Sequence, residues 1–147
     1  MTNNTPFSRL VRISDTNLTL EHAMEDIRGF SVIDSSGADI GHVDDLMIDE
    51  DHRKVRFLVV AAGGFLGFGE KRFWLPVDAV INVIEDIVKV DTTLEHLKTA
   101  PAYDPEIVPS HPYADDVYAY YGITPYWGSG YVYPPYPYFM GGAGSIS

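Results

Sequence analysis

The stretch VRFLVVAAGGFLGFGEKRFWLPV, Val55–Val77, decides the fold because two strand-like runs flank a glycine-rich segment. The first run, Val55–Ala62, is the most hydrophobic of the chain, which is typical of a central strand. The second run, Arg72–Val77, contains a tryptophan and a proline and also has strand character. The glycines between the runs therefore predict a wide hairpin loop that joins two strands. They are Gly63, Gly64, Gly67 and Gly69.

Further strand-like runs lie outward from this hairpin. Gly29–Asp34 and Ile40–Asp49 precede it, and Asp86–Val90 follows it after a one-turn segment. Within Ile40–Asp49 the apolar spacing changes between three and two, which predicts a β-bulge near Asp44–Asp45. A short helix is expected in residues 92–100, with Thr92 or Thr93 as its N-cap. This pattern predicts an all-β fold, a small antiparallel barrel with one short helix.

The glycine-rich loop does not fit a nucleotide-binding P-loop. That motif requires Ser or Thr after its lysine and then a helix whose amides face the phosphate. Here Arg72 follows Lys71 and a strand comes next. The loop also contains the apolar residues Phe65, Leu66 and Phe68, which we expect to fold over a barrel end or to contact a partner.

Composition and charge restrict the classes of partner. The chain has 147 residues and a net charge of −11, which opposes binding to nucleic acid or to an anionic membrane surface. It has no cysteine, so disulfides and thiolate chemistry are excluded. No apolar run approaches the roughly 20 residues that span a bilayer. We therefore expect a soluble, cytoplasmic protein that binds neither nucleic acid nor membrane.

The polar residues do not form a recognisable catalytic or metal-binding motif. The acids from Asp44 to Asp51 lack the glycine and the length of a calcium loop, so we interpret them as a solvated strand face and turn, salt-bridged to the basic residues that follow. Around the first strand we expect an exposed ion pair of Arg28 rather than a buried one. The histidines have no zinc-ligand spacing; they are His22, His42, His52, His96 and His111. We predict no catalytic residues, no metal site and no cofactor.

Four segments in series, DIRGFSVIDSSGADIGHVDDLMIDED, VRFLVVAAGGFLGFGEKRFWLPVDAV, DIVKVD and LKTAPAYDPE, resemble the PRC-barrel domain over about residues 15–106. That family is named for the cytoplasmic part of the photosynthetic reaction-centre H subunit, and it also forms the C-terminal half of a ribosome maturation factor. Free-standing bacterial members often carry an extension similar to Asp115–Trp127. The resemblance implies a small β-barrel that serves as an interaction or assembly module, with no assigned catalytic residues.

The C-terminal segment differs in composition from the rest. Residues 101–147 hold all ten tyrosines and eight of the ten prolines, and no Lys or Arg follows Lys98. We therefore predict three parts: an N-terminal lead-in at 1–24 whose apolar patch LVRI can add an edge strand, a PRC-barrel domain at 25–108, and an aromatic extension at 109–147. Residues 114–122 can form a short helix that Gly122 stops, and an extended chain follows because prolines break the helix.

The aromatic content of this tail favours docking over disorder. Tyrosine and tryptophan give a large contact area at low entropic cost, so we expect the tail to dock on a barrel, its own or a neighbour's. The predicted interface combines the loop residues Phe65, Leu66 and Phe68 with Tyr118, Tyr121, Tyr126, Trp127, Tyr131, Tyr133, Tyr136 and Tyr138.

The leading hypothesis for function is a non-catalytic module that self-associates into a homo-oligomer or scaffolds another protein. One alternative, from the maturation factor, is an adaptor associated with ribosomes or RNA processing. Another is a regulator that responds to a metal or a ligand.

Overall fold

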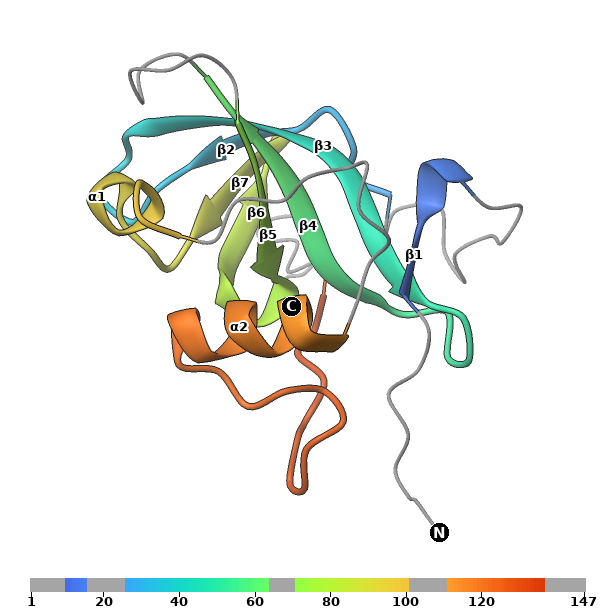
Figure 1. Ribbon diagram of the computed structural model, residues 1–147. Helices are drawn as coiled ribbons and strands as arrows, with labels where there is room; N and C mark the ends of the chain where they lie inside the picture. The colour runs from blue at the N-terminus through green and yellow to red at the C-terminus, as the bar shows by residue number, and fades with distance from the viewer. Residues whose placement is uncertain (1–9, 16–25, 64–70, 101–110, 137–147) are drawn as a thin grey trace, which may run out of the picture.

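The computed structural model describes residues 10–15, 26–63, 71–100 and 111–136. In this part of the chain, seven strands form one sheet that curls into a half-barrel (Figure 1). The strands are β1 (Leu10–Arg12), β2 (Ser31–Ile33), β3 (Asp39–Asp49), β4 (Val55–Ala62), β5 (Lys71–Pro76), β6 (Val80–Ile84) and β7 (Ile87–Val90). The helices are α1 (Leu94–Leu97) and α2 (His111–Tyr121), with one-turn 3-10 helices η1 (Ile13–Asp15) and η4 (Val77–Ala79).

The sheet has the order β5-β4-β3-β2-β7-β6, and β1 pairs with β3 outside this path. The predicted β-barrel fold is confirmed, and the expected lead-in strand is present as β1. One pair departs from the antiparallel pattern, because β2 and β7 run parallel. This pair joins the hairpin β6–β7 to the four strands β2–β5 and so extends the curled sheet.

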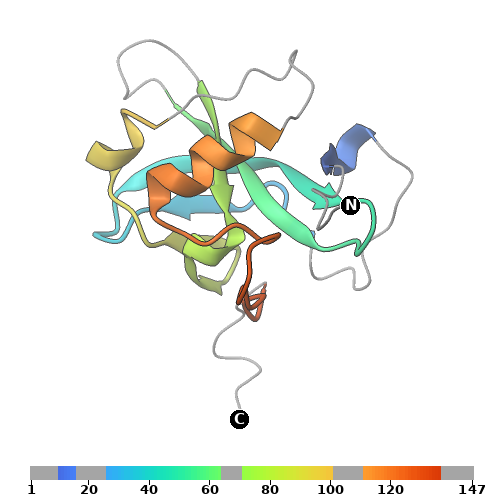
Figure 2. The same ribbon diagram turned by 60° about the horizontal axis from the view of Figure 1, so that its bottom comes forward.

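Strand β4 is central, as its hydrophobic sequence predicts. It lies between β3 and β5, and all eight of its residues are buried. Leu58 and Val60 point into the barrel core, whereas Phe57 and Val59 belong to a second apolar cluster on the outer face. Helix α2 covers that outer face, as Figure 2 shows. Burial of both faces explains why β4 has a continuous apolar sequence and not an alternating one.

Two bulges bend the long strand pair β3–β4. Val43 pairs with Val60 and Asp45 pairs with the adjacent Val59, so Asp44 is the extra residue, and the predicted bulge is confirmed. At the other end Met47 pairs with Phe57 and Ile48 with Val55, which makes Arg56 the extra residue of β4. An extra residue locally reverses which face a side chain points to. The second bulge therefore decides where the Arg56 side chain goes.

Gly41 lies where β3 and β4 approach closely. A Cβ atom at this position would lie 1.9 Å from the carbonyl oxygen of Ala61. Only glycine fits this crossing without a backbone shift.

Helix α1 is confirmed, with Thr93 as its N-cap. The Thr93 hydroxyl accepts a hydrogen bond from the His96 amide at 3.1 Å. Asp34 also supports this end of the helix, because its buried carboxylate accepts hydrogen bonds from the Leu94 amide at 2.9 Å and from the turn after β2. Before β2, Arg28 and Asp26 form an ion pair at 2.6 Å with partly exposed side chains, as expected.

Residues 78–84 differ from the single turn that we expected. They contain the end of η4 and the strand β6, which pairs with β7 through a tight hairpin. The two turn residues, Glu85 and Asp86, have φ values of +50° and +68°. Such type I′ turns usually carry Asn-Gly, so Glu-Asp did not indicate a hairpin in the sequence.

Helix α2 begins at His111, before the predicted start, and ends at Tyr121, directly before the predicted stop at Gly122. Gly122 has a φ of +69°, and its amide donates to the Ala119 carbonyl at 3.2 Å. The Ile123 amide donates to the Tyr118 carbonyl at 3.0 Å, which completes a Schellman motif. No helix in the described part of the chain is long and apolar enough to span a bilayer.

Candidate functional site

The outer face of the sheet carries an aromatic cluster that joins α2 to the barrel. The Phe57 ring lies 4.8 Å from the Trp74 ring and 5.0 Å from the Tyr118 ring, measured between centroids. Tyr113 meets Trp74 edge-on at 4.7 Å. Aromatic pairs at such distances are worth about 0.5–1.5 kcal/mol beyond the area that they bury. The cluster therefore fixes α2 on β4 and β5.

The chain beyond α2 continues across the same barrel. Trp127 packs edge-on against Tyr118 at 5.5 Å and against Tyr126 at 5.0 Å. Further along, the Tyr133 hydroxyl donates a hydrogen bond to the Val55 carbonyl at 3.1 Å. Tyr136 is only 9% exposed and belongs to the barrel core. Residues 111–136 thus dock on the barrel of their own chain, which is one of the two dockings that the aromatic content predicts.

Arg56 connects the barrel to this aromatic tail. Its Nε donates to Asp49 at 2.6 Å, and the two side chains are 6% and 0% exposed. The guanidinium carbon lies 4.3 Å from the ring centroid of Tyr126, 5.3 Å from that of Tyr133 and 6.0 Å from that of Tyr131. A cation on an aromatic face is attracted by the ring quadrupole, more strongly when water is excluded. Arg56 therefore holds the carboxylate of β3 and three tail tyrosines together.

The buried pair corrects the interpretation of the acids from Asp44 to Asp51 as solvated surface. Asp49 is fully buried beside Arg56 and opposite Leu10 of β1, and Asp45 is 7% exposed and contacts Ser14 of η1. The Ser14 hydroxyl donates to Asp45, and so does the Leu46 amide at 2.9 Å. Asp44 and Asp51 are exposed, as predicted, but the ion-pair partner of Asp44 is Arg72 at 2.8 Å and not one of the basic residues that follow the acids.

Buried polar groups lie beside the tail. The Tyr118 hydroxyl is buried without a hydrogen-bond partner within the described structure, whereas the Tyr131 hydroxyl interacts with the half-buried Asp78 carboxylate. Burial raises the pKa of Asp78, an effect that the Tyr131 hydroxyl and the Arg56 guanidinium oppose. Burial also raises the pKa of both tyrosines, and the Asp78 carboxylate adds to this rise. Each unsatisfied buried group costs about 1–3 kcal/mol. The polar cluster therefore weakens the docking that Arg56 and the aromatic rings stabilise.

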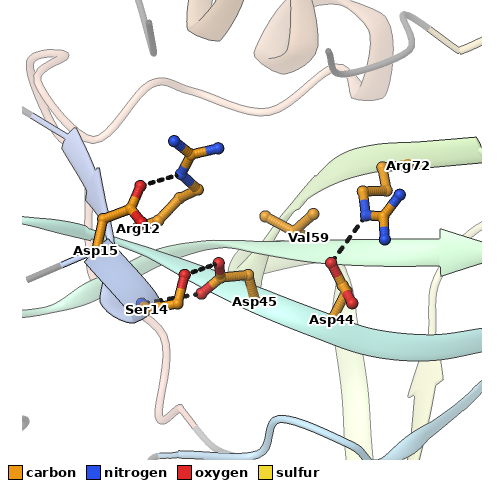
Figure 3. A pocket seen from close by; sticks show the side chains of 7 residues that line it. All are labelled: Arg12, Ser14, Asp15, Asp44, Asp45, Val59 and Arg72. Atoms are coloured by element: carbon orange, nitrogen blue, oxygen red, sulfur yellow. Dashed lines mark hydrogen bonds and ion pairs between the residues drawn. The ribbon is translucent and has the colours of Figure 1, made fainter. Parts of the chain in front are cut away.

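A hollow of about 370 Å³ opens beside Val59, between the η1 segment and Arg72 of β5 (Figure 3). Arg12 and Asp15 form an ion pair at 2.6 Å on one side, and Arg72 and Asp44 form another on the opposite side, with Val59 between them. Each guanidinium thus already contacts a carboxylate. The described residues contain no group of three or more His, Asp or Glu side chains that could hold a metal ion.

An exposed apolar patch lies on the β6–β7 hairpin. Ile81, Ile84 and Ile87 are 42%, 46% and 41% exposed, and Ile84 is paired directly with Ile87 across the turn. Because paired residues share a face of the sheet, these two side chains form one outward surface.

The structure places most of the predicted interface residues within the chain's own fold. Tyr118 and Tyr136 are buried, and the others are half-buried; these are Tyr121, Tyr126, Trp127, Tyr131 and Tyr133. Phe65, Leu66, Phe68 and Tyr138 lie outside the described residues. A role of any of these residues between molecules stays a prediction.

Three contributors to the docking were missed in the sequence. Arg56 was grouped with surface charges, although it is a single arginine inside an otherwise apolar strand, and this position was the available signal. Tyr120 stacks on His96 at 4.3 Å and contacts α1 through its hydroxyl, which no local pattern indicates. Trp74 appeared only as part of a strand.

Comparison with known proteins gives one finding. The family model of the PRC-barrel domain matches residues 21–97, just over half of the chain. No curated protein matches. The matched region contains β2 to β7 and α1 and ends before α2, so the aromatic tail lies outside it.

Proposed function

Because the chain belongs to the PRC-barrel domain family, we propose that it is a non-catalytic protein-interaction module that assembles with copies of itself by exchanging its aromatic tail. The observation that carries this proposal is the contact between tail and barrel within one chain. It consists of packed rings, the Arg56 guanidinium and one hydrogen bond to a strand carbonyl. Every copy carries both halves of this contact.

Exchange between copies reproduces the same contacts. Such swapping is a low-cost route to oligomers, because the contact is optimised in the monomer and only the connection between the elements changes. The segment between α1 and α2, residues 98–110, is that connection. An exchange that closes on itself gives a dimer, whereas an exchange that passes from copy to copy gives a chain.

Buried polar groups beside the tail favour reversible docking. The unpartnered Tyr118 hydroxyl and the Asp78 carboxylate, whose charged form burial disfavours, lower the free energy that holds the tail in place. A tail that leaves its barrel on occasion can meet the barrel of a neighbour. The loop residues Phe65 and Phe68 are the second predicted contact, because closely approaching barrels would cover apolar loops.

The test is co-purification of two tagged forms of the full chain. The two forms are mixed, incubated in mild denaturant and returned to buffer, and tandem affinity steps and light scattering then follow heteromers and mass. We expect heteromers whose fraction rises with protein concentration. Trp127→Ala should lower the heteromer fraction, whereas the matched control Val132→Ala, an 80% exposed tail position, should not.

Two outcomes would count against the proposal in different ways. A monomeric mass at every concentration removes self-assembly altogether. If heteromers still form with Trp127→Ala but are lost with Phe65→Ser and Phe68→Ser, the protein self-assembles through the loop and not by tail exchange.

A further inference from the structure

The two halves of the curled sheet differ in how their outer faces are covered. The apolar cluster that α2 forms with the sheet contains residues of β1, β3, β4 and β5 and none of β6 or β7. On the β6–β7 hairpin, Ile81, Ile84 and Ile87 remain 41–46% exposed. The outer face of this hairpin is therefore the apolar part of the described sheet that α2 leaves uncovered.

Exposed acidic residues flank these isoleucines along the chain. Glu85 and Asp86 form the exposed turn between Ile84 and Ile87, and Asp91 is exposed directly after β7. Lys89 is the one basic residue of residues 80–91 and is half-buried. The hairpin thus has an apolar centre and an acidic border, in a chain whose net charge is −11.

The charge decides which partner fits. Docked surfaces have complementary potentials, and like charges placed opposite each other are costly. A second copy would bring the same acidic border to the contact, so a homotypic contact here is opposed. A partner with Lys or Arg around apolar side chains would cover the isoleucines and pair with the acids at the border.

We propose that the outward face of the β6–β7 hairpin binds a basic segment of another protein, one that presents aliphatic side chains between Lys or Arg residues. This surface is separate from the contact between tail and barrel, and its failure would leave tail exchange intact.

The test begins with an unbiased probe. A displayed library of random peptides is selected against the full chain, and an enriched peptide is synthesised with a fluorescent label. We expect enrichment of Val, Ile or Leu together with Lys or Arg. Binding measured by fluorescence anisotropy should weaken about tenfold with Ile84→Ser, because roughly half of an isoleucine side chain is removed from the contact. Val132→Ser is the matched control for loss of an exposed aliphatic residue elsewhere and should change nothing.

A second variant separates binding from folding. Glu85→Asn combined with Asp86→Gly removes two charges and supplies the pair of residues that a type I′ turn prefers. Thermal stability should therefore rise or stay equal, while peptide affinity falls several-fold and its salt dependence decreases. Asp116→Asn, an exposed acid on α2, is the matched control and should leave affinity unchanged.

Several results would overturn the proposal. They are the absence of any enriched peptide, enrichment of acidic peptides, and binding that Ile84→Ser does not weaken. A fall in oligomer mass caused by Ile84→Ser would show that the face is a contact between copies and would also overturn it.

Discussion

Replacing Arg56 with methionine removes the cation between β3 and the tail while it keeps most of the side-chain volume. The matched control is Arg28→Met. Both arginines contact an aspartate at 2.6 Å, but the Arg56–Asp49 side chains are 6% and 0% exposed, whereas those of Arg28 and Asp26 are 39% and 32% exposed. The two variants therefore differ in burial and not in the length of the bond.

Burial sets the expected magnitude. Loss of one partner from a buried ion pair leaves an uncompensated charge and costs about 3–5 kcal/mol. Loss of an exposed pair costs about 0–1 kcal/mol. The cation–π contacts of Arg56 with the tail are part of the first figure and are not added to it, because interactions that share one group are not additive. A domain of this size is stable by about 5–15 kcal/mol, so Arg56→Met removes a large share.

Urea unfolding followed by tryptophan fluorescence measures both effects. The chain has two tryptophans, Trp74 in β5 and Trp127 in the tail, so variants that retain one of them report on barrel and tail separately. In Arg56→Met we expect the Trp127 signal to change at lower urea concentration than the Trp74 signal. Equal costs for Arg56→Met and Arg28→Met would falsify the assignment of Arg56 as the group that holds the tail. Adding Asp49→Asn to Arg56→Met should recover part of the loss, because the stranded charge is removed.

Three further substitutions test other parts of the fold. Tyr136→Ala should cost about 3 kcal/mol in thermal unfolding, because a core aromatic ring is lost. Asp34 is buried, which raises its pKa, but hydrogen bonds from Ser36, Leu94 and Ala38 outweigh this and hold the pKa at about 2. Its folded-state pKa is therefore below the unfolded one, so the loss caused by Asp34→Asn should be full at neutral pH and should shrink as denaturation is measured from pH 4 toward pH 2. The pKa of Asp78 is raised by burial, so Asp78→Asn should stabilise the protein at neutral pH, and this gain should fade in acidic buffer where Asp78 itself becomes protonated.

The elements that the sequence predicted well are those with strong local signals. Strand β4 has a continuous apolar run, the bulge at Asp44 interrupts a regular spacing, and Thr93 and Gly122 are residue types that begin and end helices. These signals act within a few residues of the feature that they predict, and the structure confirms each of them.

The elements that were missed depend on contacts and not on the preferences of single residues. The turn at Glu85–Asp86 adopts positive φ values because its flanking strands pair, although neither residue favours that region as glycine or asparagine does. Asp49 is buried beside Arg56 and opposite Leu10 of β1, which is far from it in sequence. The tail docks at a still larger separation, since Tyr133 and the Val55 carbonyl that it bonds are 78 residues apart. A single sequence gives no signal for pairs at such separation.

In the candidate site, too, the feature with a local signal was predicted and the long-range contact was not. Aromatic enrichment predicted that the tail docks, and residues 111–136 do so on their own barrel. The position that receives the tail was not predicted, because Arg56 follows closely on a charged turn and was interpreted as pairing with its surface acids. The exposed isoleucines of β6, Ile81 and Ile84, were not predicted, because residues 78–84 were expected to form a turn and not a strand.

The surface under α2 has a consequence for how the chain forms during synthesis. Its residues come from β1, β3, β4 and β5, all of which leave the ribosome before α2. Chains generally fold from the N-terminal side as they emerge, so the last segment to appear meets a surface that exists only once those strands have paired in register. A barrel with a slipped strand would offer α2 and Tyr136 no matching site, and its apolar tail would stay uncovered. Tail docking therefore distinguishes a correctly assembled barrel from a misassembled one as soon as translation ends.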